Sequence, residues 1–231
     1  MSSLSIKLGF WSALLSAIAF IVFTGCFVAI VMVSPIFIWT DLSDYVFYVS
    51  NNSQFFQHLA RLTMLLFGPL FIVMLNSIHE YADDDRKILA RISVCFGTGF
   101  ALLTGVNYFI QLSVVRQNIA NGHLEGLAQI VQANPTSAIS AINMLGWSLF
   151  LGLSSLFIAP VFSGSRLEQT IKAIFIANGI FCLLGGLSYV FENILLLFFS
   201  MNFGMGGSVT AITILLSILF KRLGKLSLPE M

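Results

Sequence analysis

The chain opens with an apolar run that strongly limits what it can fold into. Residues 8–39 form a stretch of 32 residues without one charged side chain. A helix of about 20 apolar residues crosses the roughly 30 Å hydrocarbon core of a bilayer. The run exceeds the apolar core of a signal peptide, and no clear cleavage site follows it. We therefore expect a first transmembrane helix over Leu8–Ile38.

The rest of the chain has the same character. Of the 231 residues, 58% are hydrophobic and only 9% are charged, whereas a soluble domain carries about 25% charged residues. Long apolar runs without alternation favour transmembrane helices over a barrel. The predicted fold class is an all-α polytopic transmembrane helix bundle, with residues 1–231 forming one transmembrane domain.

Six apolar runs are long enough to be spans. The five that follow the first are Leu59–Ile78, Ile88–Val115, Ala138–Phe162, Ile171–Leu197 and Gly206–Phe220. The last two are expected to be joined by a turn in the glycine-rich stretch Ser200–Ser208, because clustered glycines favour turns.

The basic residues predict how these spans are oriented. Alternate connections collect nine of them, which are Lys7, Arg86, Lys87, Arg91, Arg166, Lys172, Lys221, Arg222 and Lys225. The other connections hold only Arg61 and Arg116. Because cytoplasmic loops are enriched in Lys and Arg, both termini are expected in the cytoplasm. Trp11 and Trp39 lie about 42 Å apart on a continuous helix, which would place them at opposite interfaces.

Polar side chains form a stripe near the outer end of the third expected span. At 3.6 residues per turn, Thr104, Asn107, Tyr108 and Gln111 fall within about 100° of one another. By the same geometry Arg116 points to the opposite side, where it is interpreted as the outer anchor of the span.

Three more polar residues are expected at a similar depth, namely Arg61, Asn143 and Glu192. Ionisable groups inside a bilayer are costly and tend to face a bundle interior or a water-filled cavity. The opposite charges of Arg61 and Glu192 at similar depth invite pairing, which would lower the cost of each, but the sequence leaves open whether the two meet. The prediction is an outward-facing pocket lined by Arg61, Asn107, Tyr108, Gln111, Asn143 and Glu192. The alternative is that the amides only join helices and the charges sit among headgroups.

Small residues recur every four positions on the third span, at Ser93, Gly97, Ala101 and Gly105. Such faces allow helices to approach closely in lipid. They serve contacts within one chain or between chains, and Gly97, Ala101 and Gly105 are the residues expected at an oligomer contact.

The known signatures of catalytic and cofactor sites are missing. The three histidines and three cysteines show no zinc spacing, no HExxH and no CxxC. There is also no GxSxG elbow, Walker loop or dinucleotide-binding fingerprint. We therefore expect no catalytic residue, no metal, no cofactor and no nucleic-acid partner, and an enzyme is the weaker class.

One part of the chain resembles a group of uncharacterised bacterial multi-pass membrane proteins. The resemblance rests on "NYFIQLSVVR" at Asn107–Arg116, "EGLAQIVQANP" at Glu125–Pro135 and "APVF" at Ala159–Phe162. It implies a location in a bacterial inner membrane. In that group an acidic residue follows the Asn-Pro pair near the start of the next span, whereas this chain has Asn143 with no carboxylate nearby.

These observations lead to three functional expectations. The first is a membrane protein that binds or transports a small molecule or lipid through the outward-facing pocket. The second is a non-catalytic assembly partner that packs through its small-residue helix faces. The third is an intramembrane enzyme that modifies lipids.

Overall fold

The computed structural model describes residues 1–226, and every regular element within them is a helix. This confirms the predicted all-α class. In chain order the elements are α1 (Ser3–Val33), α2 (Leu42–Asn51), α3 (Phe55–Tyr81), α4 (Lys87–Ile110), the π-helical turn η1 (Gln111–Val115), α5 (Arg116–Asn121), the 3₁₀ turn η2 (Leu127–Gln129), α6 (Ala138–Leu145), the π-helical turn η3 (Gly146–Phe150), α7 (Leu151–Ile158), the 3₁₀ turn η4 (Ala159–Val161), α8 (Arg166–Val190), α9 (Ile194–Phe198), the π-helical segment η5 (Phe199–Met205) and α10 (Gly206–Leu226).

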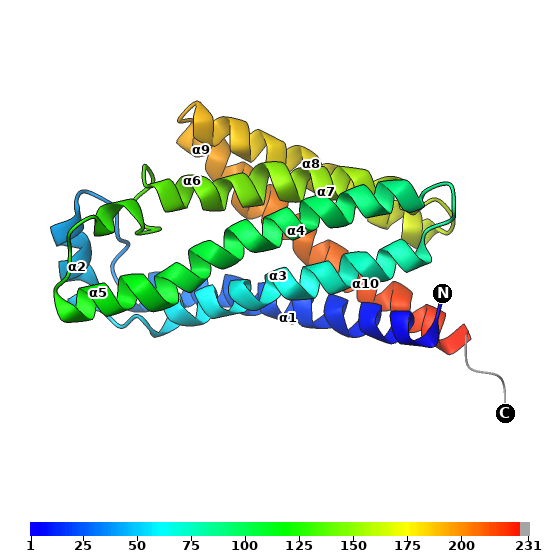
Figure 1. Cartoon of the computed structure of the whole chain (residues 1–231), viewed down its shortest axis with the longest axis horizontal. Coiled ribbons are helices and arrows are strands. Elements are labelled where there is room, and N and C mark those ends of the chain that lie inside the picture. Colours follow the sequence, from blue (N-terminus) through cyan, green and yellow to red (C-terminus); the bar gives the residue numbers. More distant parts are fainter. Residues whose placement is uncertain (227–231) are drawn as a thin grey trace.

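Within the described residues, six continuous helical segments are long and apolar enough to cross a membrane. They are Ser3–Val33, Phe55–Tyr81, Lys87–Asn121, Ala138–Val161, Arg166–Val190 and Ile194–Lys225. The chain is thus a multi-pass membrane protein. The spans run side by side in one bundle, and α1 begins at the end where α10 finishes (Figure 1). We call this the termini end, and the opposite end, which carries α2 and α5, the α2 end.

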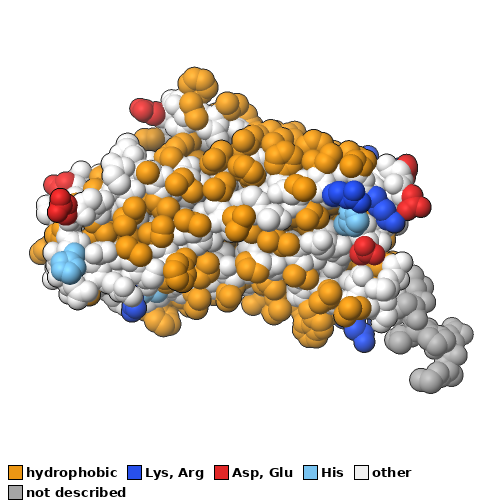
Figure 2. Space-filling view, in the orientation of Figure 1, with side chains coloured by type: hydrophobic (Ala, Val, Ile, Leu, Met, Phe, Trp, Pro, Cys, Tyr) orange, Lys and Arg blue, Asp and Glu red, His pale blue; other side chains and the backbone are white. Residues whose placement is uncertain are grey.

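The surface of the bundle is apolar along its length. Hydrophobic side chains cover much of the visible face, and Lys and Arg side chains gather mainly at the termini end (Figure 2). Leu102 and Phe109 on α4 are 64% and 61% exposed. Exposure of such apolar side chains to water would be unfavourable, whereas their contact with acyl chains is favourable, as expected of helices that face lipid.

Two separate hydrophobic clusters hold the bundle together. The main core includes Phe67, Phe100 and Trp147, and the Phe100 and Trp147 rings lie 4.8 Å apart. A second cluster, which we call the cap cluster, is formed by buried Tyr45, Val115, Leu127 and Val131 at the α2 end. The α2 end therefore has packing of its own, built from α2, α5 and the segment between residues 122 and 137.

The first span differs from its expected bounds. The Ser2 Oγ accepts a hydrogen bond from the Ser5 N–H at 3.1 Å, which starts α1 earlier than Leu8. Ser34 is extended, with φ −140°, because a proline disfavours helical geometry in the residue before it. Trp39 thus lies beyond α1 and packs 5.8 Å from the Tyr45 ring. The expected continuous helix from Trp11 to Trp39 is wrong.

The turn expected in the glycine-rich stretch is also wrong. Residues 200–208 lie inside the sixth span, and the reversal occurs at residues 191–193 instead. The glycines serve close helix packing. A Cβ added to Gly185 would lie 2.3 Å from the Met201 sulfur, and one on Gly204 would lie 2.3 Å from Phe181 Cγ. Small residues let these two helices approach in lipid.

The small-residue face of α4 is largely used inside the chain. A Cβ on Gly97 would lie 2.3 Å from Leu75 Cδ1, and the Ser93 hydroxyl donates to the Ser154 carbonyl at 2.8 Å. Ala101 is in close contact with Gly68. At Gly105, by contrast, no heavy atom of the described chain lies within 4 Å of an added Cβ. Of the three residues predicted to form a contact between chains, Gly105 is therefore the one with open space beside it.

Candidate functional site

The α2 end contains two adjoining hollows. The first, about 390 Å³, is lined by a mixture of polar, basic and aliphatic residues, mainly of α2, α3, η1 and α5, and we call it the basic hollow because Arg61 and Arg116 line it. The second, about 440 Å³, is lined largely by aromatic and aliphatic residues of α1, α2 and α3, and we call it the aromatic hollow. Both fall within the roughly 300–1,000 Å³ typical of small-molecule sites. Tyr45, Gln54 and Arg61 line both hollows and form their common wall.

Arg61 has the central position in this arrangement. It lies in the second turn of α3, below the start of the span at Phe55. His58 and Arg116 line the basic hollow with it. Among residues 1–226 no carboxylate lines either hollow or lies within 4.0 Å of Arg61. The result is a cluster of cationic and titratable groups without a protein anion.

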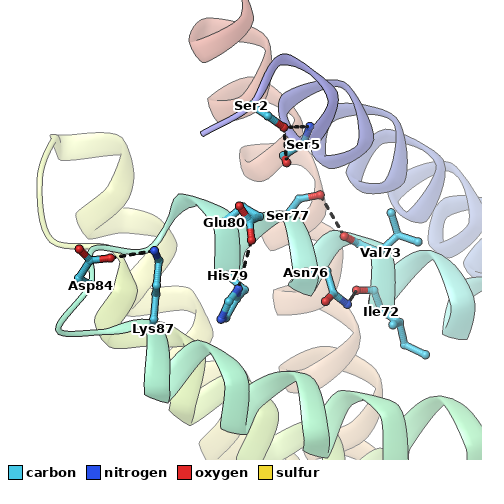
Figure 3. Close-up of polar contacts among 10 residues, drawn as sticks. All are labelled: Ser2, Ser5, Ile72, Val73, Asn76, Ser77, His79, Glu80, Asp84 and Lys87. Carbon is cyan, nitrogen blue, oxygen red and sulfur yellow. Dashed lines mark hydrogen bonds and ion pairs between the residues drawn. The ribbon is translucent and has the colours of Figure 1, made fainter.

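Charges at the termini end are arranged differently (Figure 3). The Lys87 ammonium lies 2.8 Å from an Asp84 oxygen, and this hydrogen bond lowers the pKa of the exposed Asp84 carboxyl. His79 Nδ1 lies 3.6 Å from Glu80, and the Arg86 guanidinium donates to the Pro160 carbonyl at 3.1 Å. Arg86 and Lys87 thus have partners from the chain itself, while the other Lys and Arg side chains at this end form no ion pair in the described residues.

Tyr108 of α4 is one of the residues that line the aromatic hollow. It is 4% exposed, and its hydroxyl accepts a hydrogen bond from the Trp147 indole at 3.1 Å. The Asn143 side chain is close to the same hydroxyl, and Arg61 lines the same hollow as Tyr108. Three of the predicted site residues therefore lie near one another, with Arg61 and Asn143 close to the Tyr108 side chain.

Gln111 borders the basic hollow but has a structural task. Its amide nitrogen donates to the Ile130 carbonyl at 2.7 Å, and its carbonyl oxygen accepts from the Gln132 N–H at 3.0 Å. The side chain thereby ties the segment between residues 122 and 137 to the end of α4. For this residue the alternative interpretation, an amide that joins parts of the chain, is the better description.

The segment that Gln111 holds is well bonded within itself. The Asn134 amide donates to the Ala128 carbonyl at 2.9 Å and its oxygen accepts from the Thr136 N–H at 3.1 Å. The Ser137 hydroxyl caps α6 by accepting from the Ser140 N–H at 3.2 Å. Gln132 and Ala133 of this bonded segment line the aromatic hollow.

Asn107 is buried but lines neither hollow. It is 0% exposed, and both of its amide atoms lack a hydrogen-bond partner in the described part of the chain. An unpaired buried amide costs about 1–3 kcal/mol. Asn107 therefore lies next to the site in sequence without contributing to its walls.

Glu192 is not part of this arrangement. It lies in the turn between α8 and α9, is exposed, and adopts φ 55°. The fifth span ends at Val190 rather than at Leu197, so Glu192 falls outside the helix in which it was expected. It lines neither hollow and forms no ion pair in the described chain. The question that the sequence left open is thus answered for the described chain, in which Arg61 and Glu192 form no ion pair.

Arg116 is a site residue that helical periodicity missed. In an α-helix, positions five apart differ by about 140° in direction, which placed Arg116 opposite Gln111. The π-helical turn η1 covers Gln111–Val115, and its i→i+5 bonding brings residues five apart onto nearly the same side. Gln111 and Arg116 consequently both line the basic hollow.

Comparisons with models of protein families, with curated proteins and with solved structures find no match for this chain. The resemblance of Asn107–Phe162 to bacterial membrane proteins stays a prediction. Within residues 1–226 there is also no group of three or more His, Cys, Asp and Glu side chains placed to hold a metal ion. Chemically, the site presents the guanidinium groups of Arg61 and Arg116 beside an apolar surface.

Proposed function

We propose that this multi-pass membrane protein binds a small anionic molecule or lipid at the α2 end of its bundle. The observation that carries the proposal is Arg61, whose guanidinium stands on the wall between two hollows with no carboxylate of the described chain beside it. Arginine recognises carboxylate and phosphate groups through its planar, two-pronged set of N–H donors. A ligand anion would supply the missing partner.

The location of Arg61 adds to this proposal. The residue lies within a membrane-spanning helix, where an ionised side chain is costly unless it is paired or reached by water. Arg116 lies on the same hollow, so its charge adds to the attraction for an anion and would repel a cation. The hollows favour ligands of one sign.

The expected orientation places the site on the outer side. Nine basic residues belong to the termini end and two to the α2 end, and the basic side of a membrane protein faces the cytoplasm. The ligand would then arrive from the outer solution or the outer leaflet. If the resemblance to bacterial proteins holds, the membrane is a bacterial inner membrane. Binding is the step that the hollows support. Transport would require release at the termini end as well.

The test compares the parent chain with Arg61→Gln and with the matched control Arg91→Gln. Arg91 also lies in the second turn of a span, but at the termini end and away from both hollows. Each protein is purified in mild detergent, and co-purifying compounds are identified by mass spectrometry. We expect an acidic compound to be enriched with the parent and the control and lost from Arg61→Gln. Equal amounts of the same bulk lipid in all three, each still folded, would refute the proposal.

A further inference from the structure

We infer that the ligand is an amphiphile with an acid head group in the basic hollow and one hydrocarbon chain in the aromatic hollow. The inference rests on the proposed function and narrows its ligand class. The acid is a phosphate monoester or a carboxylate, and the chain is supplied by the membrane. A free small anion would use only the first hollow.

The common wall of the hollows carries this inference. Tyr45, Gln54 and Arg61 line both spaces, so a group held by Arg61 has the aromatic hollow directly beside it. A ligand that paired with Arg61 and ended there would leave a space of about 440 Å³ lined by apolar groups unused. A chain attached to the acid would bury that surface and gain roughly 25 cal/mol for each Å² removed from water.

The aromatic hollow has the surface that a hydrocarbon chain requires. Phe23 and Phe27 of α1 lie with ring centroids 4.8 Å apart, and the Phe37 and Tyr48 rings lie 4.9 Å apart. All four rings line this hollow. Aromatic and aliphatic side chains bind flexible chains through contact area rather than direction, so they accept a chain without defining its length sharply.

The hollow is also placed to receive a chain from the bilayer. Three of its lining residues, Phe27, Val31 and Ile36, are 50%, 58% and 72% exposed. Phe27 and Val31 belong to a membrane-spanning helix, so their exposed sides face acyl chains. A lipid could thus enter the site sideways, with its chain leading along α1 and its head drawn toward Arg61.

The test uses the full chain in phosphatidylcholine nanodiscs and three probes. Lysophosphatidic acid carries the acid and the chain, glycerol 3-phosphate carries the acid alone, and lysophosphatidylcholine carries the chain with a zwitterionic head. Binding is measured as the rise in the thermal unfolding midpoint with probe concentration, since a ligand that binds only the folded state stabilises it. We expect lysophosphatidic acid to bind at least about tenfold more tightly than either other probe.

Variants separate the two hollows. Ala133→Trp and Val31→Trp would each obstruct the aromatic hollow, whereas Ala120→Trp would obstruct the basic one. Exposed Ala138, which lines neither hollow, provides the matched control Ala138→Trp. We expect the first two variants to weaken lysophosphatidic acid binding by about tenfold or more and to leave glycerol 3-phosphate unchanged. Ala120→Trp should weaken both, and Ala138→Trp neither. Val31 is 58% exposed, so that variant remains informative if Ala133→Trp does not fold.

The outcomes distinguish the inference from the function on which it rests. If glycerol 3-phosphate binds as tightly as the lysolipid acid, the chain has no role, and the inference fails while the anion site stands. If lysophosphatidylcholine binds as tightly, the acid head has no role, and both fail. If none of the probes shifts the midpoint, both fail as well.

Discussion

Two buried asparagines in different parts of the bundle show how differently its regions are built. Asn178 on α8 is 1% exposed, donates to the Ser155 hydroxyl at 2.7 Å and accepts from the Ser208 hydroxyl at 2.8 Å. Asn107 on α4 is 0% exposed and has no partner for either amide atom in the described chain. The first amide joins three helices. The second adds a cost that the fold does not offset locally.

The contrast extends to the surrounding groups. Where α4 meets α7, the Ser93 hydroxyl donates to the Ser154 carbonyl at 2.8 Å and the Ser154 hydroxyl donates to the Ser93 carbonyl at 3.0 Å, with the two hydroxyl oxygens 3.0 Å apart. Around the hollows, Gln57 and His58 each keep an unpartnered buried atom. Natural proteins break packing rules chiefly at functional sites. Unpartnered buried atoms also occur at Ser16 and His79, away from the hollows, so the comparison distinguishes individual polar groups that the packing satisfies from those that it leaves unpaired. Four measurements would break or sharpen it.

The largest expected effect concerns the packed region. Gly97→Leu places a side chain where a Cβ alone would lie 2.3 Å from Leu75 Cδ1, and overpacking of this kind costs about 1–3 kcal/mol or more. We expect a clear drop in the thermal unfolding midpoint in detergent. Gly105→Leu, with open space around it, is the control and should change the midpoint little. Equal effects of the two would show that α4 is not packed as described.

The next effect concerns the segment between residues 122 and 137, which Gln111 ties to the end of α4. Gln111→Ala leaves the Ile130 carbonyl and the Gln132 N–H without their side-chain partner, which costs about 1–3 kcal/mol for groups that stay buried. We expect faster hydrogen exchange in residues 122–137 as well as a lower midpoint. Exposed Gln117→Ala serves as the control. Unchanged exchange in that segment would mean that its packing does not depend on Gln111.

A change of opposite sign is expected at Asn107. Asn107→Leu replaces an unpaired buried amide with an apolar group of similar shape, which removes a penalty of about 1–2 kcal/mol. The unfolding midpoint should rise. A fall would reveal that the amide has a partner, such as an internal water, and would remove one side of the comparison between the two asparagines.

The smallest effect is expected at Asn178. Asn178→Leu removes two hydrogen bonds between helices, and such bonds in membrane proteins contribute about 0.6 kcal/mol each on average. We expect the midpoint to fall by an amount that matches roughly 1 kcal/mol. The sign relative to Asn107→Leu is the decisive readout. If both variants shift the midpoint in the same direction, the two regions do not differ in the way proposed.

Much of the fold could be predicted from residue order alone. The six spans follow from apolar length, because crossing a bilayer depends mainly on the summed transfer energy of neighbouring residues. Arg61 and Tyr108 could be found because polar groups stand out in an apolar run. Their assignment to the same site as Glu192 failed, because a short turn ends α8 at Val190 and moves the carboxylate out of the helix.

The site shows most clearly what the sequence alone could not determine. The sequence identified the membrane class, the spans, the side with fewer positive charges and the arginine within the second span, since these depend on local composition. Only the tertiary structure showed that η1 brings Arg116 and Gln111 to the same hollow and that α1 and α2 supply residues to an aromatic hollow. It alone also showed that no carboxylate of residues 1–226 lies within 4.0 Å of Arg61. These features depend on how segments far apart in the chain pack. A single π-helical turn, or an earlier helix end such as the one at Val190, redirects a side chain without any strong local signal.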